Sequence, residues 1–453
     1  MSGKIERMIG ELYVNDPERA DAVVFGRTGE PSRRGFLGGA GLAAVGAAVG
    51  GTIPFAASMP AGLIPAALAQ DAKPAVGPAV AAASKGPQFL QFPGKDGGLV
   101  VLGDRPLVAE TPEHLLDDDT TPTAKFFVRN NGQVPDEAKD AAGWKFAIDG
   151  EVNATLELTL ADLKAKFKPY TYRTVLECGG NGRSFFDPPA RGNQWGNGGA
   201  GCAEWTGVRL SDVLKAAGLK SSAVFTGHYG ADPHLSGDTK VESISRGVPI
   251  AKAMQEECLI AWDMNGKPLL NIHGGPVRIV IPGWPASSSA KWLKRIWVRD
   301  REHDGQGMGG VSYRVAKVPM IPGGKVDNAN FKILESMPVR SIVTSPANGA
   351  KLAKGTSEVK LRGAAWAGDL TVKQVDVSID FGVSWQRADL AAPRNRFDWQ
   401  RWTATVKLPS DGYFEIWARA TDSNGALQPH IAGNWNPQGY GGNPFHRVAI
   451  LVG

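Results

Sequence analysis

One short segment combines residue types that together can bind a soft metal. It reads Glu177-Cys178-Gly179-Gly180-Asn181-Gly182-Arg183-Ser184 and follows a run of β-branched and apolar residues. Glycines let a backbone approach a bulky group and leave its N–H groups free to donate. An arginine such as Arg183 favours the thiolate of Cys178, which is the metal-binding form. The same segment is also compatible with a structural cysteine buried at the end of a strand.

Two other loop regions are rich in hydrogen-bond donors. The first, ahead of a Val-Pro turn, holds Arg129, Asn130 and Asn131. The second, around two Pro/Gly turns, holds His273, Arg278, Ser289 and Lys291. Guanidinium, imidazole, hydroxyl and ammonium groups gathered in loops suit an anionic, phosphorylated ligand. Two ordinary polar turns would have a similar composition, so these segments alone leave the ligand open.

The cysteine count limits the kinds of metal centre that this chain can hold. The three cysteines are Cys178, Cys202 and Cys258, and an odd count leaves at least one free thiol. No Cys-x-x-Cys-His motif occurs, so we expect no haem in this chain, and no cysteine cluster suits an iron–sulfur or structural zinc centre. We expect Cys202 and Cys258 to be buried apolar residues, and any metal to be held by few protein ligands.

The N-terminal region predicts export. Arg33 and Arg34 precede a weakly apolar stretch rich in Gly and Ala, and a second small-residue patch suits cleavage after Ala69. This pattern is typical of a twin-arginine signal, a route understood to move folded proteins that often carry a cofactor. We expect residues 1–69 to be the signal region, residues 70–87 a flexible lead-in, and the mature protein to be periplasmic. A transmembrane anchor is the weaker alternative, because prolines interrupt the apolar run.

The overall composition is that of a soluble globular protein. Apolar residues make up 42% and charged residues 21% of the 453 residues, and the net charge is only +5. With so small a net charge and no dense basic run, we expect no nucleic-acid partner. We also expect no membrane partner. The length allows two or three domains.

The first part of the mature chain mixes strand and helix patterns. Thr171–Leu176 and Val277–Ile281 are strand-like runs bounded by turn residues. Leu210–Ala217 and Ile250–Glu256 are short helical segments between such runs. This mixture predicts one α+β domain over residues 88–336.

The last part of the chain has strand patterns without helical segments between them. Two runs alternate apolar and polar residues with a period of two. Their apolar members are Val375, Val377, Ile379 and Phe381 in the first run, and Phe414, Ile416, Ala418 and Ala420 in the second. We therefore expect an all-β, immunoglobulin-like sandwich over residues 337–453.

Smaller polar features have plainer interpretations. The run Asp117-Asp118-Asp119 predicts a solvated turn. His228 and His234 belong to a Gly/Asp/Pro-rich segment, where they would either line a pocket or lie in a solvated loop.

Taken together, the motifs resemble the sulfite oxidase family of molybdenum enzymes. Four separated motifs recur in order between Phe126 and Arg447, nearly the whole mature chain. The resemblance implies a sulfite-oxidase-type α+β domain that binds one molybdenum-pyranopterin (molybdopterin) cofactor, followed by a dimerisation sandwich. It also implies that a single protein thiolate completes the sulfur ligation of molybdenum, and Cys178 matches that position.

The resemblance also implies roles for the polar residues. Those matching cofactor contacts are Asn130, Asn131, Asp232, His273, Arg278, Ser289 and Lys291. Those matching catalytic positions are Arg129 and Arg183, which would line the substrate pocket, and Tyr313, the active-site tyrosine.

Two departures bear on the substrate. Asn131 stands where enzymes acting on free sulfite usually have histidine, and Gln438 stands where they have another substrate-binding arginine. Losing a fixed cation should weaken capture of a small dianion. Several stretches, among them Ser245–Ile250, look like the sulfane dehydrogenase branch. That branch oxidises sulfur held on a carrier protein and donates electrons to a c-type cytochrome.

The resemblance therefore implies a periplasmic sulfane or sulfite dehydrogenase working by oxygen-atom transfer from water. Its partners would be a c-type cytochrome acceptor and a sulfur-carrier protein, in a homodimer or heterotetramer. Two alternatives stay open at this point. One is a dehydrogenase for free sulfite that donates to cytochrome c, and the other is a cofactor-free periplasmic binding module.

Overall fold

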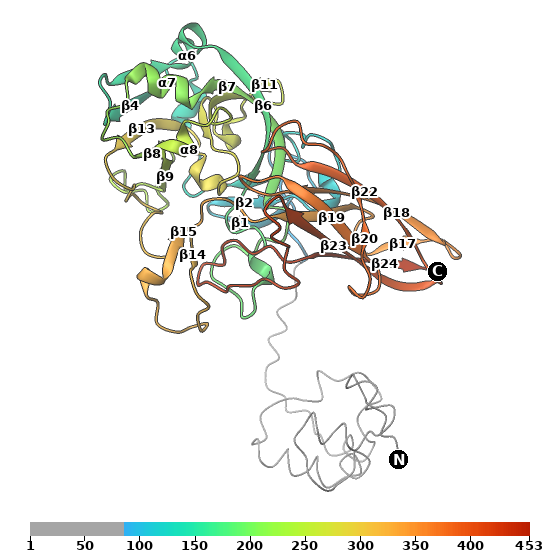
Figure 1. The fold of residues 1–453 in the computed structure, drawn as a ribbon. Coiled ribbons are helices and arrows are strands. Elements are labelled where there is room, and N and C mark those ends of the chain that lie inside the picture. Colours follow the sequence, from blue (N-terminus) through green and yellow to red (C-terminus); the bar gives the residue numbers. More distant parts are fainter. Residues whose placement is uncertain (1–85) are drawn as a thin grey trace, which may run out of the picture. The chain divides into compact units, whose positions relative to one another are not determined.

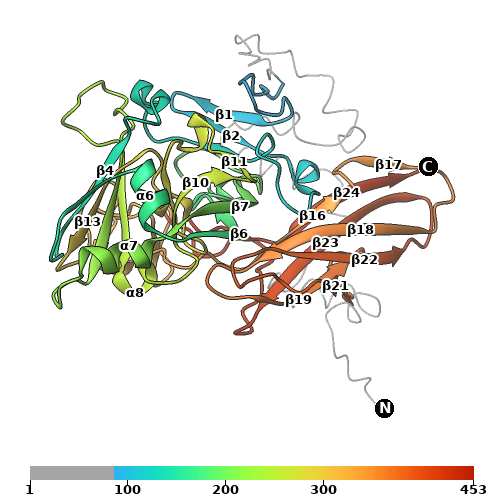
Figure 2. The same ribbon diagram turned by 90° about the horizontal axis from the view of Figure 1, so that it is seen from above.

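The computed structural model describes residues 86–453. The predicted signal region and all but the end of the predicted lead-in lie outside these residues. Strands dominate the described part, and only three α-helices occur in it: α6 (Leu160–Lys166), α7 (Leu210–Ala217) and α8 (Ile250–Ala253). Both ribbon views show these helices on the side away from the C-terminal strands (Figures 1 and 2). No helix among residues 86–453 is long and apolar enough to cross a membrane.

Three sheets build the described region before residue 300. A small sheet has the order β1-β2-β3. A five-stranded sheet has the order β11-β10-β7-β6, with β12 also paired to β10, and a second has the order β5-β4-β13-β8-β9. The strands are β1 (Val100–Asp104), β2 (Leu107–Glu110), β3 (Val128–Arg129), β4 (Lys145–Gly150), β5 (Leu156–Thr159), β6 (Pro169–Glu177), β7 (Ala200–Arg209), β8 (Phe225–Gly230), β9 (Ser245–Pro249), β10 (Leu259–Met264), β11 (Lys267–Pro268), β12 (Arg278–Val280) and β13 (Leu293–Arg299).

The predicted strands and helices of this region are present, with one correction. The two predicted strands correspond to β6 and β12, and the first predicted helix is α7, which ends at Gly218 in the left-handed region with φ +70°. The second predicted helix, over Ile250–Glu256, is wrong in length, since α8 ends at Ala253. A turn follows instead, in which the N–H of Cys258 donates to the Gln255 carbonyl.

The C-terminal region is all β, as predicted. Two sheets, with the orders β16-β18-β22-β21 and β17-β24-β23-β19-β20, share one apolar core. Their strands are β16 (Arg340–Ser345), β17 (Ala350–Leu352), β18 (Glu358–Trp366), β19 (Val372–Ser378), β20 (Gln386–Arg387), β21 (Asp389–Leu390), β22 (Gln400–Lys407), β23 (Gly412–Asp422) and β24 (His446–Val452). A separate hairpin, β14 (Arg314–Ala316) with β15 (Phe331–Ile333), precedes them. The immunoglobulin-like topology stays a prediction.

One predicted strand is shorter than its alternating pattern suggests. β19 ends at Ser378, so Ile379 and Phe381 lie beyond it. Asp380 accepts hydrogen bonds from the Ser384 backbone and side chain, which closes a turn, and Phe381 is 60% exposed with φ +58°. Local side-chain hydrogen bonding therefore ends the strand where the period-two pattern continues.

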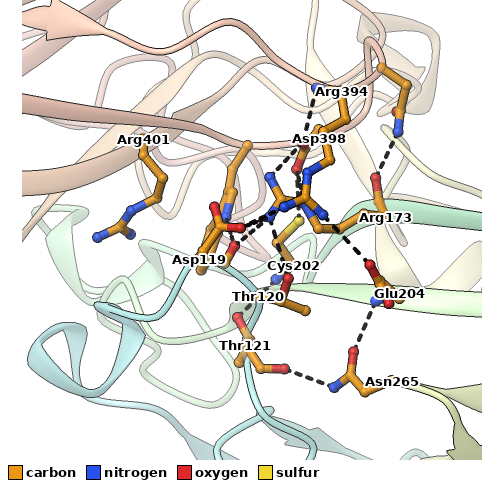
Figure 3. A network of polar contacts seen from close by, with 12 residues as sticks. Asp119, Thr120, Thr121, Arg173, Cys202, Glu204, Asn265, Arg394, Asp398 and Arg401 are labelled. Atoms are coloured by element: carbon orange, nitrogen blue, oxygen red, sulfur yellow. Dashed lines mark hydrogen bonds and ion pairs between the residues drawn. The ribbon is translucent and has the colours of Figure 1, made fainter.

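The three consecutive aspartates at 117–119 lie at a partly solvated bend, with the Asp119 side chain 58% exposed, but they also form ion pairs that the sequence did not predict. Asp119 accepts from Arg173 on β6 and from Arg394 in the sandwich, as Figure 3 shows. Asp117 accepts from Arg362 and Arg401 on sandwich strands, and Asp118 accepts from Lys125. These carboxylates therefore take part in the junction between the sandwich and the rest of the described chain.

The sandwich packs against one face of β6. Arg173 and Val175, two residues apart on that strand, both lie on this face. The Arg173 guanidinium binds the Asp398 carboxylate through Nε and Nη2, at 2.8 and 2.7 Å (Figure 3). Val175 packs with Trp366 and Trp399 of the sandwich. The other face of β6 carries Leu176, which belongs to a different core.

Candidate active site

A single pocket brings together most of the predicted site residues. Its lining includes ten of the eleven: Cys178, Arg129, Asn130, Asn131, Asp232, His273, Arg278, Ser289, Lys291 and Tyr313. They come from the ends of β3 and β6, the loop after β8, the turns on either side of β12, and the loop before β14. Segments more than 180 residues apart in the sequence therefore meet around one thiol.

Cys178 follows the last residue of β6 and lies at the wall of this pocket. Its side chain is in the apolar cluster with Phe126 and Phe127, and only 7% of the residue is exposed. Its N–H donates to the Gly199 carbonyl at 2.8 Å. Gly182 has φ +82°, and a Cβ there would lie 2.2 Å from the Gly442 carbonyl oxygen. The glycine is thus required by the turn that follows the thiol.

The residue before the thiol anchors this loop to the sandwich. Both oxygens of Glu177 are used: Oε1 accepts from Arg340 Nε at 2.8 Å and from Asn181 Nδ2 at 2.9 Å, and Oε2 accepts from Trp366 Nε1 at 2.7 Å. The Arg340 and Glu177 side chains are 0% and 2% exposed. Buried charges in such a satisfied network hold their neighbours in one geometry.

Basic groups also line the pocket. Lys291 Nζ donates to Asn130 Oδ1 and to the Ile272 carbonyl, both at 2.7 Å. Arg278 donates to the carbonyls of His273 and Ser289, at 2.8 and 3.0 Å. The acceptors are neutral amide oxygens, so these contacts orient the cations without cancelling their charge.

The pKa values of these basic groups reflect the burial of several positive charges near a single carboxylate, Asp232. Burial lowers the pKa of Lys291 well below its usual value, with Arg278 adding to the effect. Burial also lowers the pKa of Arg278 to about 9 and that of His273 well below its usual value. Buried cations normally have carboxylate partners. An anion entering here would meet donors that are already oriented.

Asp232 is the only carboxylate among the residues that line the pocket. It accepts from the Gly132 N–H at 3.1 Å, and burial raises its pKa to about 6. A carboxyl with a raised pKa changes its protonation near neutral pH, so it can offer either a donor or an acceptor to a bound group.

The eleventh predicted residue, Arg183, is outside the pocket lining. Its Nε donates to the Gln438 carbonyl at 2.7 Å and its Nη1 to the Asn193 carbonyl at 2.8 Å. Its guanidinium carbon lies 5.3 Å from the centre of the Tyr440 ring. Gln438, predicted to replace a substrate-binding arginine, thus lies beside Arg183 in the structure.

Three residues near the site were not among the predicted site residues. His228 and Arg246 line the pocket and are 0% and 1% exposed, whereas His234 is half-buried and does not line it. Lys95 donates to the Thr123 and Phe126 carbonyls and lies 3.0 Å from His273 Nε2. His228 could be suspected from its Gly/Asp/Pro-rich segment. Lys95 stands in no motif. Arg246 lies in Ser245–Ile250, a stretch that resembles the sulfane dehydrogenase branch, but that resemblance assigned the arginine no role.

The other two cysteines are structural, as predicted. Cys202 and Cys258 are fully buried, and their thiols donate to an Asp398 carboxylate oxygen and the Lys252 carbonyl, each at 3.2 Å. Burial raises the pKa of Cys202 well above its usual value and that of Cys258 to about 12. Both therefore stay protonated, unlike a thiol that ligates metal.

Comparison with known proteins places this geometry in a class. A family model described as "Oxidoreductase molybdopterin binding domain" matches residues 131–307, and one described as "Mo-co oxidoreductase dimerisation domain" matches residues 331–453. The chain is thus an oxidoreductase with a molybdopterin cofactor. Neither matched family is a haem domain.

Individual relatives narrow the class to a family. Sulfite oxidase of Gallus gallus is 32% identical over 377 residues, covering 79% of this chain and 79% of that protein. Mitochondrial sulfite oxidase of Mus musculus is 33% identical over 382 residues, covering 80% of this chain and 67% of that protein. The chain belongs to the sulfite oxidase family, as its motifs predicted. The crystal structure of the sulfane dehydrogenase SoxCD from Paracoccus pantotrophus shares the fold, with a TM-score of 0.64 at 24% identity over 85% of this chain and 96% of that one.

The pocket fits such a cofactor. Cys178 offers the single thiolate that a dithiolene-bound molybdenum would take from the protein. The cationic wall suits the anionic phosphate of the pterin. Ser287 also lines the pocket, and its buried Oγ has no hydrogen-bond partner among the described residues. This chemistry matches the predicted cofactor and sets aside the cofactor-free binding module.

Proposed function

We propose that this chain oxidises a sulfur compound in the periplasm and passes the electrons to a c-type cytochrome. The observation that carries the proposal is the gathering of ten motif residues around Cys178 in one pocket. For sulfite, the balanced reaction takes sulfite and water to sulfate, two protons and two electrons. A molybdenum-pterin group bound through Cys178 would supply the oxygen-atom transfer.

The residues of this chain would bind and orient the substrate. Arg129 lines the pocket with a guanidinium that donates to the Asn130 carbonyl, and its remaining donors can meet substrate oxygens. Tyr313 lines the same pocket with φ +48°, a left-handed backbone conformation that sets the direction of its ring. Its hydroxyl would donate to an oxygen of the departing product.

Sulfur held on a carrier protein is the preferred substrate of this proposal. The support is the lack of a free cation around Gln438. This residue brings no charge, and the neighbouring Arg183 already donates through Nε and Nη1 to carbonyls. A sulfane attached to a carrier has less charge to neutralise than free sulfite dianion. Free sulfite is the second candidate, favoured by the identity with sulfite oxidases.

The remaining parts of the proposal concern assembly and location. Dimerisation through residues 331–453 is favoured by the description of the family model that matches there. We propose a homodimer or a heterotetramer with the cytochrome, with an immunoglobulin-like sandwich forming the contact. Export would follow the twin-arginine route, with the cofactor inserted before transport.

Replacement of the thiol tests the enzymatic proposal. In Cys178→Ser we expect cytochrome c reduction to be lost, while Cys258→Ser, a matched change at a buried thiol outside the site, retains it. Molybdenum content measured on both proteins separates loss of metal from loss of fold. A Cys178→Ser protein with normal turnover would overturn the assignment.

The substrate is tested separately by steady-state kinetics. The protein is given either sulfite or a carrier protein that bears a cysteine persulfide, with cytochrome c as acceptor. We expect the larger kcat/KM with the persulfide carrier. A wide margin in favour of sulfite would instead identify a sulfite dehydrogenase.

A further inference from the structure

Arg246 is a buried cation in the pocket without an anionic partner. It is the second residue of β9, is 1% exposed and lines the same pocket as Cys178. Its Nη1 donates to the Gly307 carbonyl at 2.9 Å. Its Nε and Nη2 are buried and have no hydrogen-bond partner among the described residues. Unsatisfied buried donors are costly, so their retention requires a reason.

The other buried arginines of the described chain donate hydrogen bonds to carboxylates or carbonyls. Arg173, Arg299 and Arg340 each bind a carboxylate, at N–O distances of 2.8 Å or less. Arg278 uses all three of its nitrogens on carbonyls, and Arg183 uses Nε and Nη1. Only at Arg246, among these six, do both Nε and Nη2 lack a partner.

The two free nitrogens are on one edge of the guanidinium. Nε–H and Nη2–H point the same way, and this edge fits two oxygens of a carboxylate, sulfonate or phosphate group. The guanidinium carbon is 4.5 Å from the centre of the Tyr313 ring, which also lines the pocket. The flat face is thus supported by an aromatic ring, and the edge is left for a ligand.

Charged groups near Arg246 do not neutralise it. Glu302 binds Arg314 at 2.8 Å, so this nearby carboxylate already has a partner. Burial lowers the pKa of Arg246 to about 10, which leaves it charged at neutral pH. The charge faces a pocket in which Ser287 also has an unpartnered hydroxyl.

We propose that Arg246 is a specificity-determining residue, whose Nε and Nη2 bind the anionic oxygens that the sulfur carries once it is oxidised, and those of sulfite when sulfite is the substrate. The proposal rests on the proposed function and adds a residue to it. It places a substrate-binding cation on β9, on the side of the pocket where Tyr313 lies, while the donors of Arg183 are committed elsewhere. A binding role explains why the chain keeps two unsatisfied donors.

Sulfate, the product when sulfite is the substrate and a stand-in for the oxidised sulfur group of a carrier, is the probe for the test. Calorimetric titration of oxidised, cofactor-loaded protein gives its Kd for wild type, Arg246→Met and Arg246→Lys. We expect Kd to rise by about 10- to 100-fold in Arg246→Met, the range for a lost charge-assisted hydrogen bond, with partial recovery in Arg246→Lys. The thermal unfolding midpoint of Arg246→Met should be unchanged or higher, because buried unsatisfied donors are removed.

Arg314→Met is the matched control, because it removes a neighbouring cation that does not line the pocket. We expect sulfate binding there within about twofold of wild type. Three results would overturn the inference: unchanged sulfate binding in Arg246→Met, an equal loss in Arg314→Met, or loss of molybdenum from Arg246→Met, which would make it a cofactor-positioning residue. If wild type oxidises no sulfur substrate, the proposed function fails, a result distinguishable from all three.

Discussion

The two regions that border β6 bury cationic side chains in opposite ways. On the sandwich side, Arg173 and Arg340 meet Asp398 and Glu177, and all four side chains are no more than 6% exposed. On the pocket side, Arg278 and Lys291 meet only neutral oxygens, and burial lowers their pKa values. The cations of the junction are paired with carboxylates, whereas Asp232 is the only carboxylate among the residues that line the pocket. Buried cations that are paired with carboxylates fix the arrangement of the folded chain, whereas buried cations with only neutral acceptors can bind an anionic ligand.

Cofactor removal should have the largest effect, and only on the pocket side. We expect protein made in a host without the cofactor to lose all turnover and about 4 kcal/mol or more of unfolding free energy, the linkage expected when ligand exceeds Kd a thousandfold. Hydrogen exchange should accelerate at residues 126–132 and 286–292 and stay unchanged in β18 and β22. If the pocket residues exchanged hydrogen equally slowly in the cofactor-free and cofactor-loaded proteins, the contrast between the junction and the pocket would be wrong.

Breaking the junction should be the next largest effect. Arg340→Leu leaves the buried Glu177 carboxylate without its cation, and we expect a loss of about 3 kcal/mol or more in chemical denaturation. The double variant Arg340→Leu/Glu177→Leu removes both charges and should recover part of this loss. A single-variant loss under about 1 kcal/mol would show that the junction does not depend on this pair.

Stability of the cofactor-free chain should depend on pH through Lys95, next to the pocket. Burial lowers the pKa of Lys95 from 10.5 to about 7, and Asp96 opposes the shift. Between pH 7 and 9 the unfolded chain therefore binds more protons, so stability rises with pH, by at most about 1.4 kcal/mol per pH unit for one proton.

The test of this pH dependence is urea denaturation at pH 7, 8 and 9. In Lys95→Met the rise should be smaller than in wild type. The window is chosen because the carboxyl of Glu110, whose pKa is raised to about 7, titrates mostly below it. Identical slopes in the two proteins would show that Lys95 keeps its proton in the folded state.

The pocket-lining residues that stand in contiguous motifs could be predicted from the sequence, and the structure brings them together. Cys178 and its glycines, and the donors around residues 129–131 and 273–291, could be recognised because each motif has several members. The role of Arg246 could not be predicted, because the resemblance of Ser245–Ile250 to the sulfane dehydrogenase branch gave this arginine no function. Its importance depends on donors left unpaired, which only the folded arrangement reveals.

The ion pairs of the junction could not be predicted either, because their partners are far apart in the sequence. Arg173 and Asp398 are 225 residues apart, so the pairing has no local pattern. The run at residues 117–119 has the composition of a solvated turn, and its arginine partners are on remote strands. The end of β19 was missed because a side-chain hydrogen bond of Asp380 competes with the alternating pattern.

The smallest expected effect lies at the exposed rim of the junction. Asp119 accepts from both Arg173 and Arg394, but the Arg394 side chain is 53% exposed while that of Arg173 is 6% exposed. Arg394→Ala keeps the backbone N–H that donates to Asp398 and removes the solvated ion pairs with Asp119 and Glu204. We expect a loss of about 0.2–1 kcal/mol, which should shrink in 1 M salt because exposed charges are screened.

Arg173→Met is the matched variant at the same carboxylate. It removes the buried partner of Asp398 and should cost several times more than Arg394→Ala, with little dependence on salt. The ratio of the two losses measures how far the strength of the junction depends on burial rather than on the number of ion pairs. Equal losses would mean that exposed and buried pairs contribute alike, and the contrast between the junction and the pocket would then need another physical basis.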